Sequence, residues 1–505
     1  MEQVQFNLDD ILLDFSKDGN SKDTWTIRQA VEGVQIFGGI GSGKTSGSGK
    51  KIAEKYLLAP FGGLVLTTKP DEKNMWIEYC KTTGREKDLI IVEPGGEHFF
   101  NFLEYESAKE NGETSFTDNI VQVLKTVIQA GEEKSSGKSD DAFWENALDM
   151  LLFSTIDLCK LAYGKVTVPL LYNLALTSPK GKANEEEANF GDFEHALKAA
   201  KENINEQVSA FISKLSTEER RKLNDTFAMD NAIVDAIPDA AALRLVDQFF
   251  NGQYSKLGET TRSTIEFSFS GFLFRLLGEP VKSLFCNKPS TFKPEDCLEG
   301  KIIILNLPVK VFHKVGRDCQ VMFKYIWQRA MEKRDISKNG RPVFLWADEA
   351  QNFLHAYDAE CQATARSSRI ATVCISQNTQ NYHANMGGIK SEYRVKSFLG
   401  TLATQIFHAN TDIETNKYAS ELIGDGYYKD VSQSFTMSED YSETETSSMK
   451  SERRVRPEQF MKLKTGGKPN NGMIEAYMVI QGNGFSDGLN HKKVNFLQPD
   501  YFTQK

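Results

Sequence analysis

The chain has 505 residues, of which 40% are hydrophobic, 11% aromatic and 26% charged, a composition typical of a globular protein with two or three domains. Its formal charge of −9 at pH 7 excludes a protein that coats nucleic acid with its whole surface, although a small basic channel stays compatible with it. The seven cysteines are scattered and never form CxxC, which argues against a disulfide framework or a zinc site and favours a reducing compartment.

The first part of the chain predicts alternating strands and helices. VEGVQIFGG (31–39) is a short apolar run that ends in glycines, KKIAEKYLLAP (50–60) has helical spacing, and GLVLTTKPDE (63–72) begins as another buried run. DLIIVEP (88–94) is a further strand candidate. This order of strand, loop, helix and strand predicts a βαβ unit.

From about residue 116 to 280 the pattern changes to helix-length segments separated by polar loops at 131–141 and 180–191. Strand patterns then return, with helical patterns between them, at 301–309, 341–349, 371–377 and 404–410. We therefore predict an α/β fold with a central, mostly parallel sheet that is interrupted by an all-α insertion domain. The expected domains are 1–115, 116–280 and 281–505.

The segment 431–451 is rich in Ser, Thr and Glu, which is typical of a disordered acidic linker. Its first half alternates polar and apolar residues, however, and the strand-like MIEAYMVIQG follows at 473–482. An exposed β-ribbon is therefore an equally open interpretation.

The segment GGIGSGKTSGSGKK (38–51) contains GSGK twice. A phosphate loop needs Gly, four further residues, Gly, Lys and then Ser or Thr, because glycines turn backbone N–H groups towards the phosphates, the lysine reaches the β and γ oxygens, and the hydroxyl binds Mg²⁺. Only the first copy satisfies this spacing, since Lys50 is followed by Lys51 instead of a hydroxyl residue. The predicted nucleotide-binding residues are Gly38, Gly39, Gly41, Ser42, Gly43, Lys44, Thr45 and Ser46, with Lys44 also catalytic.

The segment VFLWADE (343–349) supplies the acidic element that a phosphate loop requires. Asp348, at the end of an apolar strand, is predicted to hold Mg²⁺ together with Thr45. Glu349 is placed to act as the general base on water. Two carboxylates at a strand end could instead be helix-capping residues.

Two further polar side chains are candidates for catalysis. Gln377 closes the strand ATVCISQ and could sense the γ-phosphate or orient the water, although an ordinary strand-end glutamine is the alternative. TARSSRI contains Arg366 and Arg369, of which Arg366 is the preferred candidate for an arginine that reaches the γ-phosphate of a neighbouring subunit. A solvated surface cation is the competing interpretation.

The tetrapeptide TKPD (68–71) is similar to the NKxD element by which GTPases recognise guanine. That element lies on a late strand, whereas TKPD follows the strand directly after the phosphate loop. We therefore expect ATP, with Mg²⁺, as the cofactor.

Taken together, these segments resemble the TraD/TraG-type coupling-protein ATPases of conjugation and type IV secretion, within the RecA-like branch of P-loop NTPases. The resemblance rests on IFGGIGSGKT, TTKPDE, DDAFWENALDMLL, GKIIILNLP, FLWADEAQNF with ARSSRIATVCISQNTQNY, and FLGTLATQIFHANTDIETNKYASELIG. It covers most of residues 30–500.

The resemblance implies a homo-hexameric ring, which could form only on DNA, that moves single- or double-stranded DNA or a relaxase–DNA complex. It also implies an amino-terminal transmembrane anchor, which this sequence lacks. We expect a cytoplasmic protein that a membrane partner recruits peripherally to the inner membrane, or a motor for DNA processing, packaging or defence. A motor of the same architecture that delivers protein is the third alternative.

Overall fold

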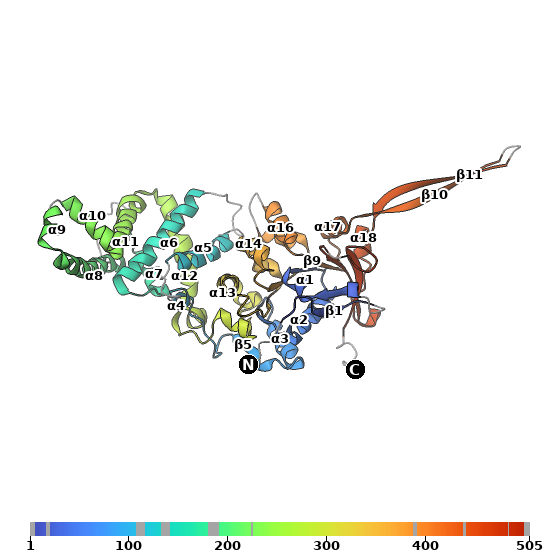
Figure 1. Cartoon of the computed structure of the whole chain (residues 1–505), viewed down its shortest axis with the longest axis horizontal. Helices are drawn as coiled ribbons and strands as arrows, with labels where there is room; N and C mark the ends of the chain where they lie inside the picture. Colours follow the sequence, from blue (N-terminus) through green and yellow to red (C-terminus); the bar gives the residue numbers. More distant parts are fainter. Residues whose placement is uncertain are drawn as a thin grey trace. The chain divides into compact units, whose positions relative to one another are not determined.

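The computed structural model describes the chain in segments that form two compact units (Figure 1). Unit 1 comprises residues 1–90, 294–311 and 327–505, and unit 2 comprises residues 91–293 and 312–326. These units divide the chain at other residues than the predicted domains, which stay a prediction. The described residues are 6–16, 21–107, 117–132, 142–179, 191–223, 226–386, 391–437, 441–482 and 484–498.

Unit 1 is built on a nine-stranded sheet with the order β13-β12-β9-β3-β8-β7-β4-β6-β5. The six strands from β9 to β6 run parallel, whereas β12 pairs antiparallel with both β9 and β13. The predicted central, mostly parallel sheet is therefore confirmed. Its strands are β3 (Val34–Phe37), β4 (Gly62–Leu66), β5 (Leu89–Val92), β6 (Ile302–Leu305), β7 (Val343–Asp348), β8 (Ile370–Ser376), β9 (Thr404–His408), β12 (Met473–Ile480) and β13 (His491–Leu497).

The burial of these strands explains their sequence patterns. Every residue of β3, β4, β6, β7, β8 and β9 is buried, as expected for parallel strands that are covered on both faces, and these strands are apolar throughout most of their length. In β13 buried and more exposed residues alternate, which fits an antiparallel strand with one covered face. The strands predicted at 31–39, 301–309, 341–349, 371–377 and 404–410 all lie in the sheet.

Helices connect the strands of unit 1 in the way that parallel pairing requires. α2 joins β3 to β4, α14 joins β7 to β8, and α15 with α16 joins β8 to β9. α13, whose residues 312–326 belong to unit 2, joins β6 to β7. The short strands β1 (Ile11–Asp14) and β2 (Thr24–Thr26), which the sequence patterns did not predict, form a separate antiparallel pair. The helices are α1 (Ile27–Val31), α2 (Lys50–Leu58), α3 (Glu72–Thr82), α13 (Val309–Glu332), α14 (Tyr357–Thr364), α15 (Thr379–Asn385), α16 (Ser391–Gly400), α17 (Ile413–Ile423) and α18 (Pro457–Phe460).

The segment with two open interpretations forms a β-ribbon. β10 (Asp425–Met437) pairs antiparallel with β11 (Tyr441–Arg453) in register from Asp425↔Arg453 to Met437↔Tyr441. Figure 1 shows this ribbon extending as a two-stranded arm. The linker interpretation of residues 431–451 is therefore wrong for the described strands, while residues 438–440 lie outside them.

Unit 2 is helical: every element described between residues 102 and 287 is a helix. Its long helices α6 and α8 pack against each other, and α6 also packs against α5, α7, α11 and α12. In this unit the buried Asp318 forms ion pairs with the buried Arg317 and the partly exposed Arg275. The predicted all-helical insertion is thus present, although its predicted loops at 131–141 and 180–191 fall mostly outside the described residues. The helices are α4 (Phe102–Ser107), α5 (Thr117–Glu132), α6 (Ala142–Tyr163), α7 (Val168–Leu176), α8 (Asp192–Lys214), α9 (Thr217–Lys222), α10 (Thr226–Ala236), α11 (Pro238–Asp247) and α12 (Glu259–Leu277).

Two further findings concern disulfide bonds and membrane-spanning helices. All seven cysteines are buried, and none of them forms a disulfide bond. Among the described helices, none combines the length and the apolar character needed to cross a bilayer.

Candidate nucleotide-binding site

The polar residues predicted from the sequence follow neighbouring parallel strands. The phosphate loop follows β3, Asp348 ends β7, and Gln377 comes directly after β8, which lies between them in the sheet. The turn after β4, Thr67 to Asp71, adjoins β7 on its other side. Because carboxyl ends of parallel strands meet at one edge of a sheet, all these segments converge there.

The phosphate loop is anchored at its beginning and open at its tip. The N–H groups of Gly38 and Gly39 donate to Ser376 O at 3.3 Å and to Ala409 O at 2.9 Å, so these two glycines fix the loop to β8 and to the end of β9. The N–H groups of Gly41, Gly43 and Lys44 have no backbone acceptor among the described residues. Backbone donors of this kind are what a phosphate needs.

Glycine is required at positions 41 and 43 by the backbone, since their φ angles are +71° and +82°. A Cβ atom on Gly43 would also lie 2.4 Å from Cδ1 of Ile474 in β12. The loop is therefore shaped by its own glycines and by an antiparallel strand that comes more than four hundred residues later in the chain.

The second GSGK copy is helical, as predicted. A π-helical turn, η2 (Thr45–Gly49), leads into α2, which begins at Lys50. Gly49 permits close packing, because a Cβ atom there would lie 2.9 Å from Lys44 O, and Ser48 Oγ lies 2.7 Å from Nε2 of the buried His408. Lys50 places its ammonium 5.9 Å from the ring centre of Tyr79. The residues of the second GSGK copy therefore pack against the segment that contains the first copy and stabilise its conformation.

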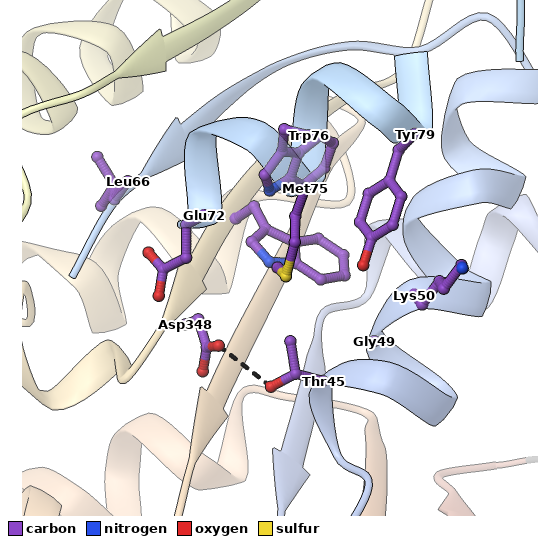
Figure 2. Close-up of a pocket in the computed structure, with 10 residues that line it drawn as sticks. Thr45, Gly49, Lys50, Leu66, Glu72, Met75, Trp76, Tyr79 and Asp348 are labelled. Atoms are coloured by element: carbon purple, nitrogen blue, oxygen red, sulfur yellow. Dashed lines mark hydrogen bonds between the residues drawn. The ribbon is translucent and has the colours of Figure 1, made fainter. Parts of the chain in front are cut away.

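The residues at the end of the phosphate loop contact the acidic strand directly. Thr45 Oγ1 donates to Asp348 Oδ2 at 3.1 Å, as Figure 2 shows. Lys44 is buried, and its charge lowers the pKa of Asp348, although burial, the largest effect, raises that pKa overall. Ser42 Oγ is buried without a hydrogen-bond partner in the described part of the chain, while Ser46 Oγ accepts from Gln498 Nε2 at 2.8 Å.

Glu349 is held in a conformation that an L residue rarely adopts. Its φ and ψ are +52° and +50°, and its N–H donates to Asp348 Oδ1 at 2.9 Å. A left-handed conformation of this kind costs on the order of 1–3 kcal/mol and persists only where the surroundings enforce it. The turn directs the chain away from β7 immediately after Asp348, and it leaves the Glu349 side chain 92% buried, since its exposed fraction is 8%.

Two amides fix the Glu349 carboxylate. Gln377 Nε2 donates to Oε1 at 3.3 Å, and Gln351 Nε2 donates to Oε2 at 2.8 Å. Gln351 in turn accepts from Ser376 Oγ at 3.0 Å. The structure thus brings Gln377 to Glu349, as its predicted role in orienting water requires, and adds Gln351, which the sequence analysis did not single out.

The turn after β4 carries two further charged residues that the sequence analysis missed. Lys69 Nζ lies 3.9 Å from Asp348 Oδ2, and Glu72 lines a pocket with Asp348 and Thr45 (Figure 2). Burial, followed by the charge of Asp348, raises the pKa of Glu72 to about 8. The sequence signal that could have identified Lys69 and Glu72 is the segment TTKPDE, because it directly follows β4, a buried strand of the same sheet.

Arg366 does not lie at this edge of the sheet. It precedes β8, whereas Gln377 follows that strand of seven residues, so the two are separated by roughly 20 Å along the strand. Arg366 forms an ion pair with Glu32 at 3.2 Å and is 58% exposed. Arg369 donates to Gly340 O. Arg366 therefore does not contact the phosphate loop of its own chain, which leaves the trans role and the surface role open.

The chemistry of this edge fits a magnesium nucleotide. A threonine hydroxyl and a carboxylate are hard oxygen ligands of the type that Mg²⁺ prefers, and Thr45 and Asp348 already lie within hydrogen-bond distance. The backbone donors at Gly41, Gly43 and Lys44 and the buried Ser42 hydroxyl fit the phosphates. Among the described residues, no group of three or more His, Cys, Asp or Glu side chains could by itself hold a metal ion.

Comparison with known proteins supports this assignment of the fold. Residues 342–465 match the family described as "TraM recognition site of TraD and TraG". No curated protein sequence matches the chain.

Solved structures of TrwB share the fold. The bacterial conjugative coupling protein TrwBdeltaN70, in an unbound monoclinic form, has a TM-score of 0.57 and 15% identity over 94% of this chain and 86% of that one. The plasmid coupling protein TrwB with the non-hydrolysable GTP analogue GDPNP has a TM-score of 0.56 and 14% identity over 94% and 87%. TrwB with ADP and Mg²⁺ has a TM-score of 0.52 and 13% identity over 94% and 86%.

The chain therefore has a RecA-like α/β fold with an all-helical insertion, and the predicted phosphate loop lies at the carboxyl ends of its parallel strands. The match of residues 342–465 confirms the predicted resemblance to TraD and TraG for that segment, and the chain shares the fold of TrwB.

Proposed function

We propose that this chain is an ATP-hydrolysing motor that acts as a coupling protein in conjugative, type IV secretion-like DNA transfer. The observation that carries the ATPase assignment is the contact between Thr45 Oγ1 and Asp348 Oδ2, with Glu349 held beside it by two amides. The match of residues 342–465 to a TraD and TraG family supports the cellular role.

The residues of the site have separate tasks in hydrolysis. Gly41, Gly43 and Lys44 bind the phosphates through backbone N–H groups, and the Lys44 ammonium reaches the β and γ oxygens. Thr45 and Asp348 hold Mg²⁺, which neutralises charge on the phosphates when bound. Glu349 accepts a proton from the attacking water, since its two oxygens are oriented by Gln351 and Gln377.

The nucleotide proposed is ATP. TrwB has been solved with ADP and Mg²⁺ and with a non-hydrolysable ATP analogue, but also with a GTP analogue. The preference for adenine therefore rests on the position of TKPD after an early strand, and competition between ATP and GTP for the site tests it.

The assembly proposed is a homo-hexamer, formed alone or on DNA, that moves DNA or a relaxase–DNA complex. An arginine from a neighbouring subunit would complete each site, and Arg366 is the candidate because it is exposed and distant from its own phosphate loop. Peripheral recruitment to the inner membrane by a partner protein is part of this proposal.

The test is the rate of ATP hydrolysis with no DNA, with single-stranded DNA and with double-stranded DNA, beside negative-stain imaging for rings. Strong stimulation by one DNA form, together with rings, is expected. Hydrolysis that no DNA form changes would contradict the DNA motor. It would favour the motor that delivers protein, for which the net charge of −9 is the supporting observation.

A further inference from the structure

Lys69 is the cation at the phosphate-binding edge that the proposed function leaves without a role. It lies in the turn between β4 and α3, and its Nζ is 3.9 Å from Asp348 Oδ2. The same oxygen accepts the hydrogen bond from Thr45 Oγ1. Lys69 therefore shares its anion with the two residues that are proposed to hold Mg²⁺.

The backbone that carries Lys69 is fixed on both sides. Thr68 N–H donates to Glu72 Oε2 at 2.7 Å, and Thr68 Oγ1 donates to Asp348 O at 3.2 Å. Pro70 follows with its restricted φ angle, and Glu72 N–H donates back to Lys69 O at 3.3 Å. The turn thus holds the Cα atom of Lys69 next to the end of β7.

The side chain of Lys69, in contrast, has room to move. It is 34% exposed, whereas the Asp348 side chain is only 4% exposed. Burial lowers the pKa of Lys69, but the nearby carboxyl groups, Asp348 first among them, outweigh that effect and raise the pKa overall, so the ammonium stays charged. A flexible stem with a permanent charge can transfer from one anion to another nearby.

A divalent cation and an ammonium group compete for one carboxylate oxygen. When Asp348 Oδ2 binds Mg²⁺, the metal ion repels the ammonium group of Lys69 from that oxygen. The γ-phosphate of the bound magnesium nucleotide is then the nearest anion with which Lys69 can pair. We infer, on the basis of the proposed function, that Lys69 determines specificity for nucleoside triphosphate over diphosphate. Its ammonium pairs with Asp348 in the nucleotide-free site and with the γ-phosphate in the triphosphate-bound site.

Glu72 is the residue that holds the turn in which Lys69 lies. Its side chain is 97% buried, since its exposed fraction is 3%, and Oε1 has no hydrogen-bond partner in the described part of the chain. Figure 2 shows its carboxyl group directed towards Asp348. Glu72 is a positioning residue, because it acts on Lys69 through the turn that its Oε2 holds.

The test compares the affinities of the intact protein for two nucleotides by calorimetry: ADP and the non-hydrolysable β,γ-imido analogue of ATP, each with Mg²⁺. Lys69→Met is expected to bind the ATP analogue about tenfold more weakly, which is the effect of losing one charged hydrogen bond, and to bind ADP within about twofold of the parent. Lys69→Arg should recover part of the loss. The matched control is Lys81→Met, at the exposed far end of α3, the helix that follows the Lys69 turn, and it should change neither affinity.

A second readout needs no nucleotide. If Lys69 competes with Mg²⁺ for Asp348, Mg²⁺ alone should raise the melting temperature of Lys69→Met more than that of the parent. Equal losses of affinity for both nucleotides, an unchanged preference for the triphosphate, or an equal response to Mg²⁺ alone would each overturn the inference.

Lys44→Met separates this inference from the proposed function. That variant should lose its affinity for both ADP and the ATP analogue. If it binds both normally, the assignment of the phosphate loop fails. If it loses both while Lys69→Met keeps the preference of the parent, only the role of Lys69 fails.

Discussion

The Thr45 hydroxyl donates to the Asp348 carboxylate at 3.1 Å, although 303 positions separate the two residues in the sequence. This contact joins the end of the phosphate loop to the end of β7. It brings together the two predicted chemical elements of the site, which lie on opposite sides of the helical insertion in the sequence.

The two GSGK copies provide an internal control for the phosphate loop. Lys44→Ala should reduce ATP hydrolysis to background without changing the fold, because Lys44 contributes charge to the phosphates. Lys50→Ala should lose little activity, because Lys50 begins α2 and stacks on Tyr79. Steady-state hydrolysis and circular dichroism of both variants test this, and a Lys44 variant that keeps more than half the rate would disprove the assignment.

Glu349, the proposed general base, can be replaced by glutamine, which has nearly the same shape. Glu349→Gln should bind ATP and fail to hydrolyse it, since an amide cannot accept the proton from water. The new amide keeps one acceptor oxygen, so it can still accept from Gln351 or from Gln377, and the other of these two hydrogen bonds is lost. A rapid-quench experiment should show bound ATP without product. Normal turnover would assign the base to another residue.

The position of Arg366 at the opposite edge of the sheet makes its role testable by mixing subunits. Arg366→Lys should bind ATP like the parent and hydrolyse it roughly 10³- to 10⁵-fold more slowly, because a lysine does not reproduce the planar pair of donors. Mixing it with Lys44→Ala subunits should restore some activity, since an intact loop then faces an intact arginine.

The control for that experiment is proof of co-assembly, for example by crosslinking differently labelled subunits. Co-assembled mixtures that stay inactive at all ratios would rule out the trans role. An Arg366→Lys variant that keeps the parent's rate would identify Arg366 as a surface cation paired with Glu32.

Glu72 should make stability depend on pH. Its pKa is raised to about 8 in the folded chain from an ordinary value of 4.5, so the folded state holds the proton more tightly than the unfolded state. The resulting stabilisation is complete below about pH 4.5 and is lost as the pH rises through 8. Glu72→Gln stays neutral and can still accept from Thr68 N–H, so it should be more stable than the parent at pH 8 to 9, by on the order of a few kcal/mol.

Thermal unfolding from pH 5 to 9 measures this difference. Glu78→Gln on the exposed face of the same helix is the control, and its curve should follow the parent. A Glu72→Gln curve parallel to the parent across this range would show that the carboxyl group is already ionised in the folded state.

Much of the site could be predicted because strand ends are visible in a sequence. Apolar runs that end in polar residues gave the phosphate loop, Asp348, Glu349 and Gln377, and parallel pairing places the carboxyl ends of their strands at the same edge of the sheet. Lys69 and Glu72 were missed although they also follow an apolar run. Their role depends on β4 lying beside β7, and a sequence pattern does not give the order of strands in a sheet.

The role of the antiparallel strand β12 was also hard to predict, because it too depends on which strands are neighbours in the sheet. β12 was expected as a strand, but not its contact with the phosphate loop, where Ile474 packs against Gly43. The β-ribbon of β10 and β11 was only one of two interpretations. Its residues are mostly polar, and most of those with a described burial, at 425–432 and 445–453, are exposed, so burial leaves little pattern in the sequence.

The order of strands in the sheet also has a consequence for synthesis on the ribosome. The neighbours of β3 are β8 and β9, so both edges of this apolar strand stay unpaired until more than three hundred further residues have been added. At about 5 to 20 residues per second that interval lasts roughly 20 to 70 seconds. Unpaired apolar strands are prone to aggregate, so the nascent chain should depend on a chaperone during this interval. A fragment that ends at residue 115 should be insoluble and should not bind nucleotide, even though it contains the whole phosphate loop.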